Sequence, residues 1–268
     1  IWLGHDRVEL RDFDISRPLV LSYETAMDVR TSIDPETATC EIASRQRQSD
    51  DIWQVHVRCR VAALTGGDKP ALAVVPNSAG GRVIPAADVY ALASDVGLDY
   101  GPAFRRLSEV IRTNEDTLHV TFDAASGLWP RSFVLSPTDL DGVFHGLFSL
   151  VGGDGVVTGG KAFIPVRLGR VQIFKSSATV ARAVISDVRV TPHALRCNLV
   201  LFDAEGSVIA QLEEARFVAA ALKADRDTDR VAYHFTGQRH FDVKRASSDL
   251  PDPEALRAKY RKERDKRL

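Results

Sequence analysis

An aspartate and a histidine four positions apart are the residues of this chain whose types and spacing best suit acid–base chemistry. Asp141 and His145 lie in a segment that begins with Ser136 and Pro137. A proline fits the first turn of a helix, because its missing N–H is not needed there. Residues four apart share one face of a helix. A carboxyl and an imidazole facing an acyl pocket together could work as an acid–base pair.

A second interpretation of the same spacing stays open. An acidic side chain in the first turn stabilises its own helix through the helix dipole, and charges at this position are common. On that interpretation Asp141 stabilises the helix, and His145 is a partly buried packing residue. The spacing alone does not choose between the two.

Hydrophobic periodicity predicts the elements that must position this pair. Apolar residues recur at helical spacing, which predicts a helix over residues 138–151 with a sheet wrapped around it; they are Leu140, Val143, Phe144, Leu147, Phe148 and Val151. Alternating segments predict strands at 118–122, 163–174, 179–190, 194–203 and 207–219. A hairpin turn is expected at 203–206.

The N-terminal quarter of the chain also alternates with period two. Residues 7–64 predict a half-buried antiparallel sheet, most clearly at 53–61, where apolar residues alternate with polar ones. His56 lies on the polar face and is expected to be solvated. Residues 65–84, rich in glycine and proline, predict a linker, and a short helix is expected from Pro85.

Composition limits the class of protein. The 268 residues include 35 basic and 36 acidic ones, so the net charge of −1 argues against nucleic-acid binding through charge. No apolar run approaches the roughly 18 residues of a membrane span, and no signal peptide is recognised. The three widely spaced cysteines predict neither a disulfide framework nor a zinc site, and fit a reduced, cytoplasmic setting. The first residue is Ile1, which suggests a piece of a longer protein.

Three motifs, taken in order, resemble the second half of a polyketide synthase dehydratase domain. They are Tyr100-Gly101-Pro102-Ala103-Phe104, Leu140-Asp141 with His145, and Ile164-Pro165-Val166-Arg167. The resemblance covers about residues 88–218. It implies an α+β double hot-dog fold, in which antiparallel sheets each wrap a central helix. The implied parts are an incomplete first hot dog (1–64), a linker (65–84), a second hot dog (85–220) and a charged, helical C-terminal tail (221–268).

The resemblance also implies an activity, the elimination of water from a 3-hydroxyacyl chain. Asp141 would protonate the departing hydroxyl, which requires a carboxyl kept protonated by apolar surroundings, and His145 would orient it. The implied substrate-binding residues are Tyr100, Gly101, Pro102, Phe104, Leu140, Phe144, Pro165 and Val166. The acyl chain would arrive on the phosphopantetheine arm of an acyl carrier protein, with no metal or other cofactor. Neighbouring synthase domains, and a second copy in a homodimer, are the other expected partners.

Two departures from the family pattern leave alternatives open. The family's base is a histidine in a His-x-x-x-Gly-x-x-x-x-Pro motif, and none of the seven histidines here fits that motif. Ser136 stands where the family usually has histidine. Either an upstream segment supplies the base and covers the apolar face of residues 7–64, or the domain serves another task. That task would be closure of an oxygen ring, or a non-catalytic structural and docking role.

Overall fold

Eleven strands and three short helices make up the described part of the chain. The computed structural model describes residues 7–20, 25–65, 68–71, 74–123, 133–151, 156 and 158–222. The strands are β1 (Val8–Ile15), β2 (Met27–Ile33), β3 (Thr39–Gln46), β4 (Gln54–Ala63), β5 (Arg82–Pro85), β6 (Leu107–Arg112), β7 (Leu118–Phe122), β8 (Ala162–Ile173), β9 (Arg182–Val190), β10 (Ala194–Phe202) and β11 (Val208–Ala220). The helices are α1 (Ala86–Asp95), α2 (Pro137–His145) and the 3₁₀ helix η1 (Gly146–Leu150). The predicted tail helix lies outside the described residues.

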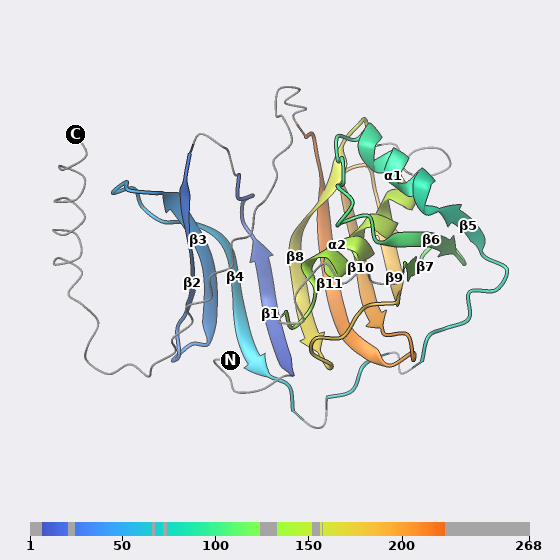
Figure 1. Cartoon of the computed structure of the whole chain (residues 1–268), viewed down its shortest axis with the longest axis horizontal. Helices are drawn as coiled ribbons and strands as arrows, with labels where there is room; N and C mark the ends of the chain where they lie inside the picture. The colour runs from blue at the N-terminus through green and yellow to red at the C-terminus, as the bar shows by residue number, and fades with distance from the viewer. Residues whose placement is uncertain are drawn as a thin grey trace. The chain divides into compact units, whose positions relative to one another are not determined.

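All eleven strands belong to one antiparallel sheet, in the order β2-β3-β4-β1-β8-β11-β10-β9-β7-β6-β5. Strand β1 joins its halves, because it pairs with β4 on one side and with β8 on the other. Figure 1 shows α1 and α2 beside the half that runs from β8 to β5. The two expected sheets are therefore continuous with each other.

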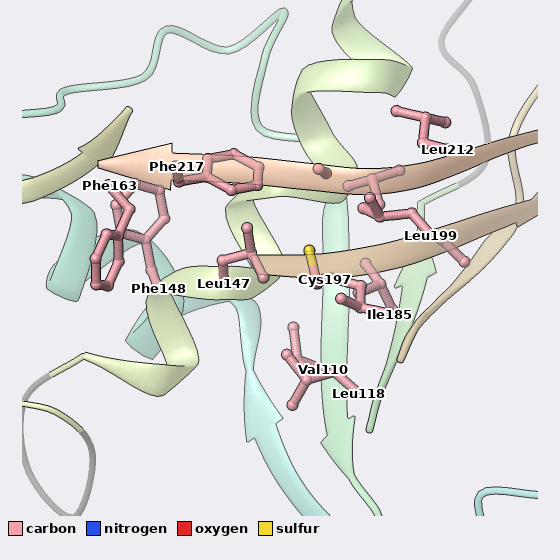
Figure 2. Close-up of a cluster of buried hydrophobic side chains, with 14 of the residues drawn as sticks. Val110, Leu118, Leu147, Phe148, Phe163, Ile185, Cys197, Leu199, Leu212 and Phe217 are labelled. Atoms are coloured by element: carbon pink, nitrogen blue, oxygen red, sulfur yellow. The ribbon is translucent and has the colours of Figure 1, made fainter. Parts of the chain in front are cut away.

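The core lies where the second half of the sheet wraps around α2 and η1. Leu147 and Phe148 from η1 meet buried side chains of the strands, among them Phe163 and Cys197 (Figure 2). Gly142 and Gly146 let the helices approach the sheet closely. A Cβ atom on Gly142 would lie 2.8 Å from a ring carbon of Phe122.

The helix predicted over 138–151 forms, but in two parts. Ser136 is the N-cap, since its Oγ accepts a hydrogen bond from the backbone N–H of Asp139 at 3.4 Å. The α-helical winding ends at His145, and η1 continues as a 3₁₀ helix. The Ser149 hydroxyl donates to the carbonyl of Gly146 at 2.6 Å, a contact three residues back that suits the tighter winding.

A row of irregularities bends the sheet around this helix. Asp187 in β9 and Glu214 in β11 both have left-handed φ angles, of 53° and 52°. Asn198 of β10 lies between them: its side chain donates to Asp187 at 2.8 Å and accepts from the backbone N–H of Glu214 at 2.9 Å. The register of β10 shifts against both neighbours at this point. Such bulges strengthen local twist and bend.

His56 corrects one prediction. It was expected to be solvated on the polar face of β4, but it is only 6% exposed. Ile42 pairs with Val57 and Ala43 with Val55, so His56 is the extra residue of a β-bulge. Its ring nitrogen Nε2 lies 2.7 Å from the hydroxyl of Ser44. The bulge breaks the period-two alternation on which the prediction depended.

The interval between the halves corrects a second prediction. The residues at 82–84 were expected to end a linker, but β5 begins at Arg82 and pairs with β6. Strand β6 was not predicted. The expected helix after Pro85 is confirmed as α1, whose N-cap is Pro85. The division of the chain into domains remains a prediction.

Strands β1 to β4 present a partly buried apolar face. Ile42 and Val57 pair across β3 and β4, and Leu10 pairs with Val61 across β1 and β4; all four are half-buried. No helix of the described residues belongs to this half of the sheet. That another segment covers this face remains a prediction.

Candidate active site

Asp141 and His145 meet as their spacing predicted. Oδ2 of Asp141 lies 3.0 Å from Nε2 of His145, one turn further along α2. The His145 side chain is fully buried, whereas that of Asp141 is 38% exposed. The carboxyl is therefore anchored from the protein side and open on the other, an arrangement that lets it meet a ligand.

The ring of His145 is enclosed by aromatic side chains. Its centroid lies 3.9 Å from that of Tyr100, at an interplanar angle of 42°. Tyr90 and Phe148 contribute edge and tilted contacts at 5.7 and 6.4 Å. Burial, helped by the negative charge of Asp141, raises the pKa of Tyr100 well above its ordinary value of 10. Tyr100 therefore remains a neutral hydroxyl beside the carboxyl.

The two ring nitrogens of His145 have different surroundings. Nε2 faces the carboxyl of Asp141 at 3.0 Å. Nδ1 is buried and has no hydrogen-bond partner among the described residues. The contact at Nε2 therefore fixes the direction of the Asp141 carboxyl.

Tyr90 is a site residue that the sequence analysis did not single out. It lies on α1, and its hydroxyl accepts a hydrogen bond from the backbone N–H of Leu107 at 3.1 Å. The same hydroxyl lies 3.5 Å from the carbonyl of Phe104. Burial is the main cause that raises the pKa of Tyr90. Tyr90 thus contacts both ends of the short segment from Phe104 to Leu107. Its place in the predicted helix was the signal that the sequence offered.

The other predicted binding residues divide into two groups. Leu140 and Phe144 pack against the core, and the Phe144 ring lies 5.2 Å from that of Phe217. Pro165 is the register partner of Phe217, so it lies beside this pair. Val166 is the extra residue of a register shift between β8 and β11.

The Tyr-Gly-Pro-x-Phe segment is less enclosed beyond its tyrosine. Gly101 and Pro102 are exposed, and Phe104 is half-buried. The structure therefore brings Tyr100, Asp141 and His145 into contact and places Phe144 and Pro165 near Phe217. The binding roles of all these residues remain predictions.

Other kinds of site are not evident in the described residues. No group of three or more histidine, cysteine, aspartate or glutamate residues there is placed to hold a metal ion. No described helix has the length and apolar character needed to span a membrane. The described surface has a hollow of about 1140 Å³ in the first half of the sheet, near Trp53 and Arg45, which neither Asp141 nor His145 lines.

Comparison with known proteins agrees with the motifs. Residues 68–227, more than half of the chain, match the family model described as the polyketide synthase dehydratase N-terminal domain. The chain is 30% identical over 127 residues to the highly reducing polyketide synthase Preu1 of Preussia isomera, covering 40% of the chain and 5% of that protein. It is 27% identical over 175 residues to the prosolanapyrone synthase of Alternaria solani, covering 62% of the chain and 6% of that protein. The aligned residues thus span only about a twentieth of the length of these relatives.

Solved structures share the fold. The dehydratase CurJ, as an inactive histidine-to-phenylalanine mutant in complex with a compound, aligns with a TM-score of 0.70 at 16% identity, over 81% of this chain and 77% of that one. A trans-AT polyketide synthase dehydratase domain from Brevibacillus brevis aligns equally well, with a TM-score of 0.70 at 18% identity and the same coverage. The expected α+β double hot-dog fold is confirmed by these alignments.

Proposed function

The chain belongs to the polyketide synthase dehydratase family, and from that premise we propose that it eliminates water from a 3-hydroxyacyl chain carried by an acyl carrier protein. The observation that carries the proposal is the contact between Asp141 and His145. A carboxyl held by a buried imidazole at 3.0 Å and 38% exposed is suited to deliver a proton to a ligand.

Asp141 is the proposed general acid. Hydroxide is a poor leaving group, so the departing hydroxyl must be protonated as its bond to carbon breaks. Asp141 donates that proton, and the departing group leaves as water. His145 acts through Asp141, since it is fully buried and its Nε2 fixes the orientation of the carboxyl. The half-buried Leu140 directly precedes Asp141 and the half-buried Phe144 follows it by three residues; both supply an apolar wall for the acyl chain.

The proposed reaction also needs a base to remove the proton next to the thioester carbonyl. Of the described histidines, His145 is the one in contact with Asp141. His56 is bonded to Ser44 in the other half of the sheet, and His193 lies in the turn before β10. His119 of β7 is buried and pairs with Val184, which belongs to a different cluster from the core around α2. We therefore assign the base to an imidazole outside the described residues, such as one supplied by another segment of the synthase.

The partners and setting follow from the same proposal. Elimination of water changes no oxidation state, so the chemistry requires no redox cofactor, and the phosphopantetheine arm of a carrier protein presents the substrate. Because the alignments span only 5% and 6% of the curated relatives, we place this domain beside other synthase domains. A cytoplasmic setting is part of the proposal. A homodimer remains part of the proposal.

The test uses the synthase that contains this chain. Dehydration of a 3-hydroxyacyl thioester is followed by mass spectrometry, as loss of one water from the carrier-bound acyl group. Asp141→Asn keeps the size of the side chain and removes its acidity, so we expect the rate to fall by about 10²–10⁴-fold. Asp95→Asn, at an exposed position at the end of α1, is the matched control and should retain the parent rate. Full activity of Asp141→Asn would show that the acid is another residue.

Product analysis in the same assay separates the competing functions. If the parent synthase releases no unsaturated product while the domain remains folded, the non-catalytic docking role is favoured. A product that has the mass of the unsaturated acyl group but contains a closed oxygen ring would indicate cyclisation.

A further inference from the structure

A second aspartate of the same helix forms a buried ion pair that is separate from the proposed acid. Nε of Arg106 lies 3.1 Å from Oδ1 of Asp139, and the two side chains are 9% and 6% exposed. The other carboxylate oxygen of Asp139 accepts a hydrogen bond from the backbone N–H of Val180 at 3.3 Å, just before β9. Asp139 therefore ties the first turn of α2 to two other segments.

Arg106 lies at the end of the loop that carries Tyr100. Its backbone N–H donates to the carbonyl of Phe104 at 2.9 Å, and its carbonyl accepts from the N–H of Asp123 at 2.9 Å. Its neighbour Arg105 donates from Nε to the carbonyl of Tyr100, also at 2.9 Å. The segment from Tyr100 to Arg106 is thus fixed internally, and the ion pair attaches it to α2.

The side chain of Arg106 also runs along the helix surface. A Cβ atom on Gly142 would lie 3.4 Å from Cβ of Arg106, so the glycine leaves room for the arginine. Asp139 and Gly142 are three residues apart and share one face of α2. Asp141 is two residues from Asp139, about 200° around the helix axis. A contact on the Asp139 face consequently controls where the carboxyl of Asp141 points.

We propose that Arg106 and Asp139 are positioning residues, which fix the rotation of α2 so that Asp141 and His145 face Tyr100. This inference rests on the proposed function for its catalytic consequence, though not for its structural one. Arg106 does not touch the reacting atoms. Its hydrogen bond is directional, and a small misplacement of a reacting group can reduce a rate by as much as about 100-fold.

The ion pair could instead serve stability alone, so the test separates the two roles. Breaking a buried pair on one side is strongly destabilising, whereas replacing both partners by apolar residues of similar volume is often neutral. The double variant Arg106→Met/Asp139→Asn removes both charges, while the amide oxygen can still accept the backbone N–H of Val180. It is therefore expected to melt near the parent temperature, and each single variant well below it. If the pair serves stability alone, the double variant should regain the parent's activity and His145 signals. If the pair positions α2, it should not.

Two readouts are compared at equal stability. The first is the nitrogen NMR spectrum of the chain with ¹⁵N-labelled histidine, in which His145→Gln identifies the His145 signals. We expect two well-separated ring signals in the parent, from one fixed tautomer, and signals averaged by exchange in the double variant. The second is dehydration by the synthase, where we expect kcat to fall about tenfold with KM unchanged.

The control and the contradicting outcomes complete the test. Asp203→Asn weakens the ion pair of Asp203 with Lys175, at 2.6 Å, and should lower stability while leaving the His145 signals unchanged. Separated His145 signals and parent kcat in the double variant would overturn the proposal. If the double variant is unstable, Arg106→Lys is used instead, because lysine lacks the Nε donor. Its His145 signals should change in the same direction but by less, and parent-like signals would also contradict the proposal. Absence of dehydration in the parent would refute the proposed function, while the NMR comparison would still decide the positioning role.

Discussion

The ring of Tyr100 lies against the imidazole of His145, with their centroids 3.9 Å apart. Tyr100 follows α1 in a loop, and His145 ends α2, so this contact joins two segments 45 positions apart in the sequence. It also closes one side of the imidazole, leaving Nε2 to bond Asp141. The site therefore depends on the loop as much as on the helix.

The first prediction concerns stability at alkaline pH. Burial raises the pKa of Tyr100 above the ordinary value of 10, and the nearby charge of Asp141 adds to this. The folded state holds the phenol proton more tightly than the unfolded state does. The contribution of Tyr100 to the free energy of unfolding is therefore complete below about pH 10 and is lost as the pH rises toward the raised pKa of the folded state. The free energy of unfolding of Tyr100→Phe should therefore fall less steeply between about pH 9 and pH 11 than that of the parent. Equal slopes would contradict the burial of the phenol.

The second prediction concerns His145. His145→Gln keeps a hydrogen-bond donor within reach of Asp141, whereas His145→Leu removes it. We expect the glutamine variant to retain dehydration within about tenfold, and the leucine variant to lose about a further tenfold although it remains folded. Rates in the synthase and circular dichroism of the chain are the measurements. A leucine variant as active as the glutamine variant would exclude an orienting role for the imidazole.

The third prediction concerns the close approach of α2 and η1 to the sheet. A Cβ atom at Gly142 would meet Phe122, and one at Gly146 would meet Val120, each at 2.8 Å. Helix propensity alone favours alanine over glycine by about 1 kcal/mol, but overpacking a close contact costs about 1–3 kcal/mol. Urea unfolding should therefore show Gly142→Ala and Gly146→Ala to be less stable than the parent. Gly101→Ala, which meets no atom within 4 Å, is the control and should change little.

The fourth prediction concerns the strand that joins the two halves. Glu9 of β1 is only 2% exposed, and its carboxylate accepts hydrogen bonds from Arg170 at 2.8 Å and from Gln172 at 3.2 Å of β8. Burial alone would raise the pKa of Glu9, but its bonds to Arg170 and Arg11 outweigh this and lower it below 4.5.

A carboxyl whose pKa is lowered in the folded state stabilises the fold above its ordinary value, and this contribution is lost as the pH falls through the lowered one. Glu9→Gln should therefore cost about 1–2 kcal/mol at neutral pH and give a flatter loss of stability below about pH 4.5. Parallel pH profiles of parent and variant would contradict this. Glu36→Gln, at an exposed turn position, is the control.

Local sequence patterns predicted the parts of the fold whose residues alternate without interruption. Strands β8 to β11 were expected close to where they lie, since each has one face in the core. The helix start was predicted from Pro137, a first-turn proline, and the structure adds Ser136 as its N-cap. Contact between Asp141 and His145 followed from helical spacing alone.

Sequence patterns failed to predict the structure where a β-bulge or a partner distant in the sequence decides the burial or pairing of a residue. His56 is buried because β4 carries an extra residue opposite β3, which shifts the side chain out of the expected alternation. Strand β6 is held by pairing with β5 and β7 more than by its own alternation. Arg106 and Asp139 are 33 positions apart, and neither local sequence predicts that they form an ion pair.

The sequence by itself determined the helix and the face shared by Asp141 and His145, because these depend on interactions within a few residues. Only the tertiary structure decided that Tyr100 and Tyr90 enclose the imidazole of His145 and that Arg106 forms an ion pair with Asp139. It also decided that both halves share one sheet. These contacts join segments far apart in the chain. Their geometry follows from how the whole sheet bends and packs, which no local pattern of residues encodes.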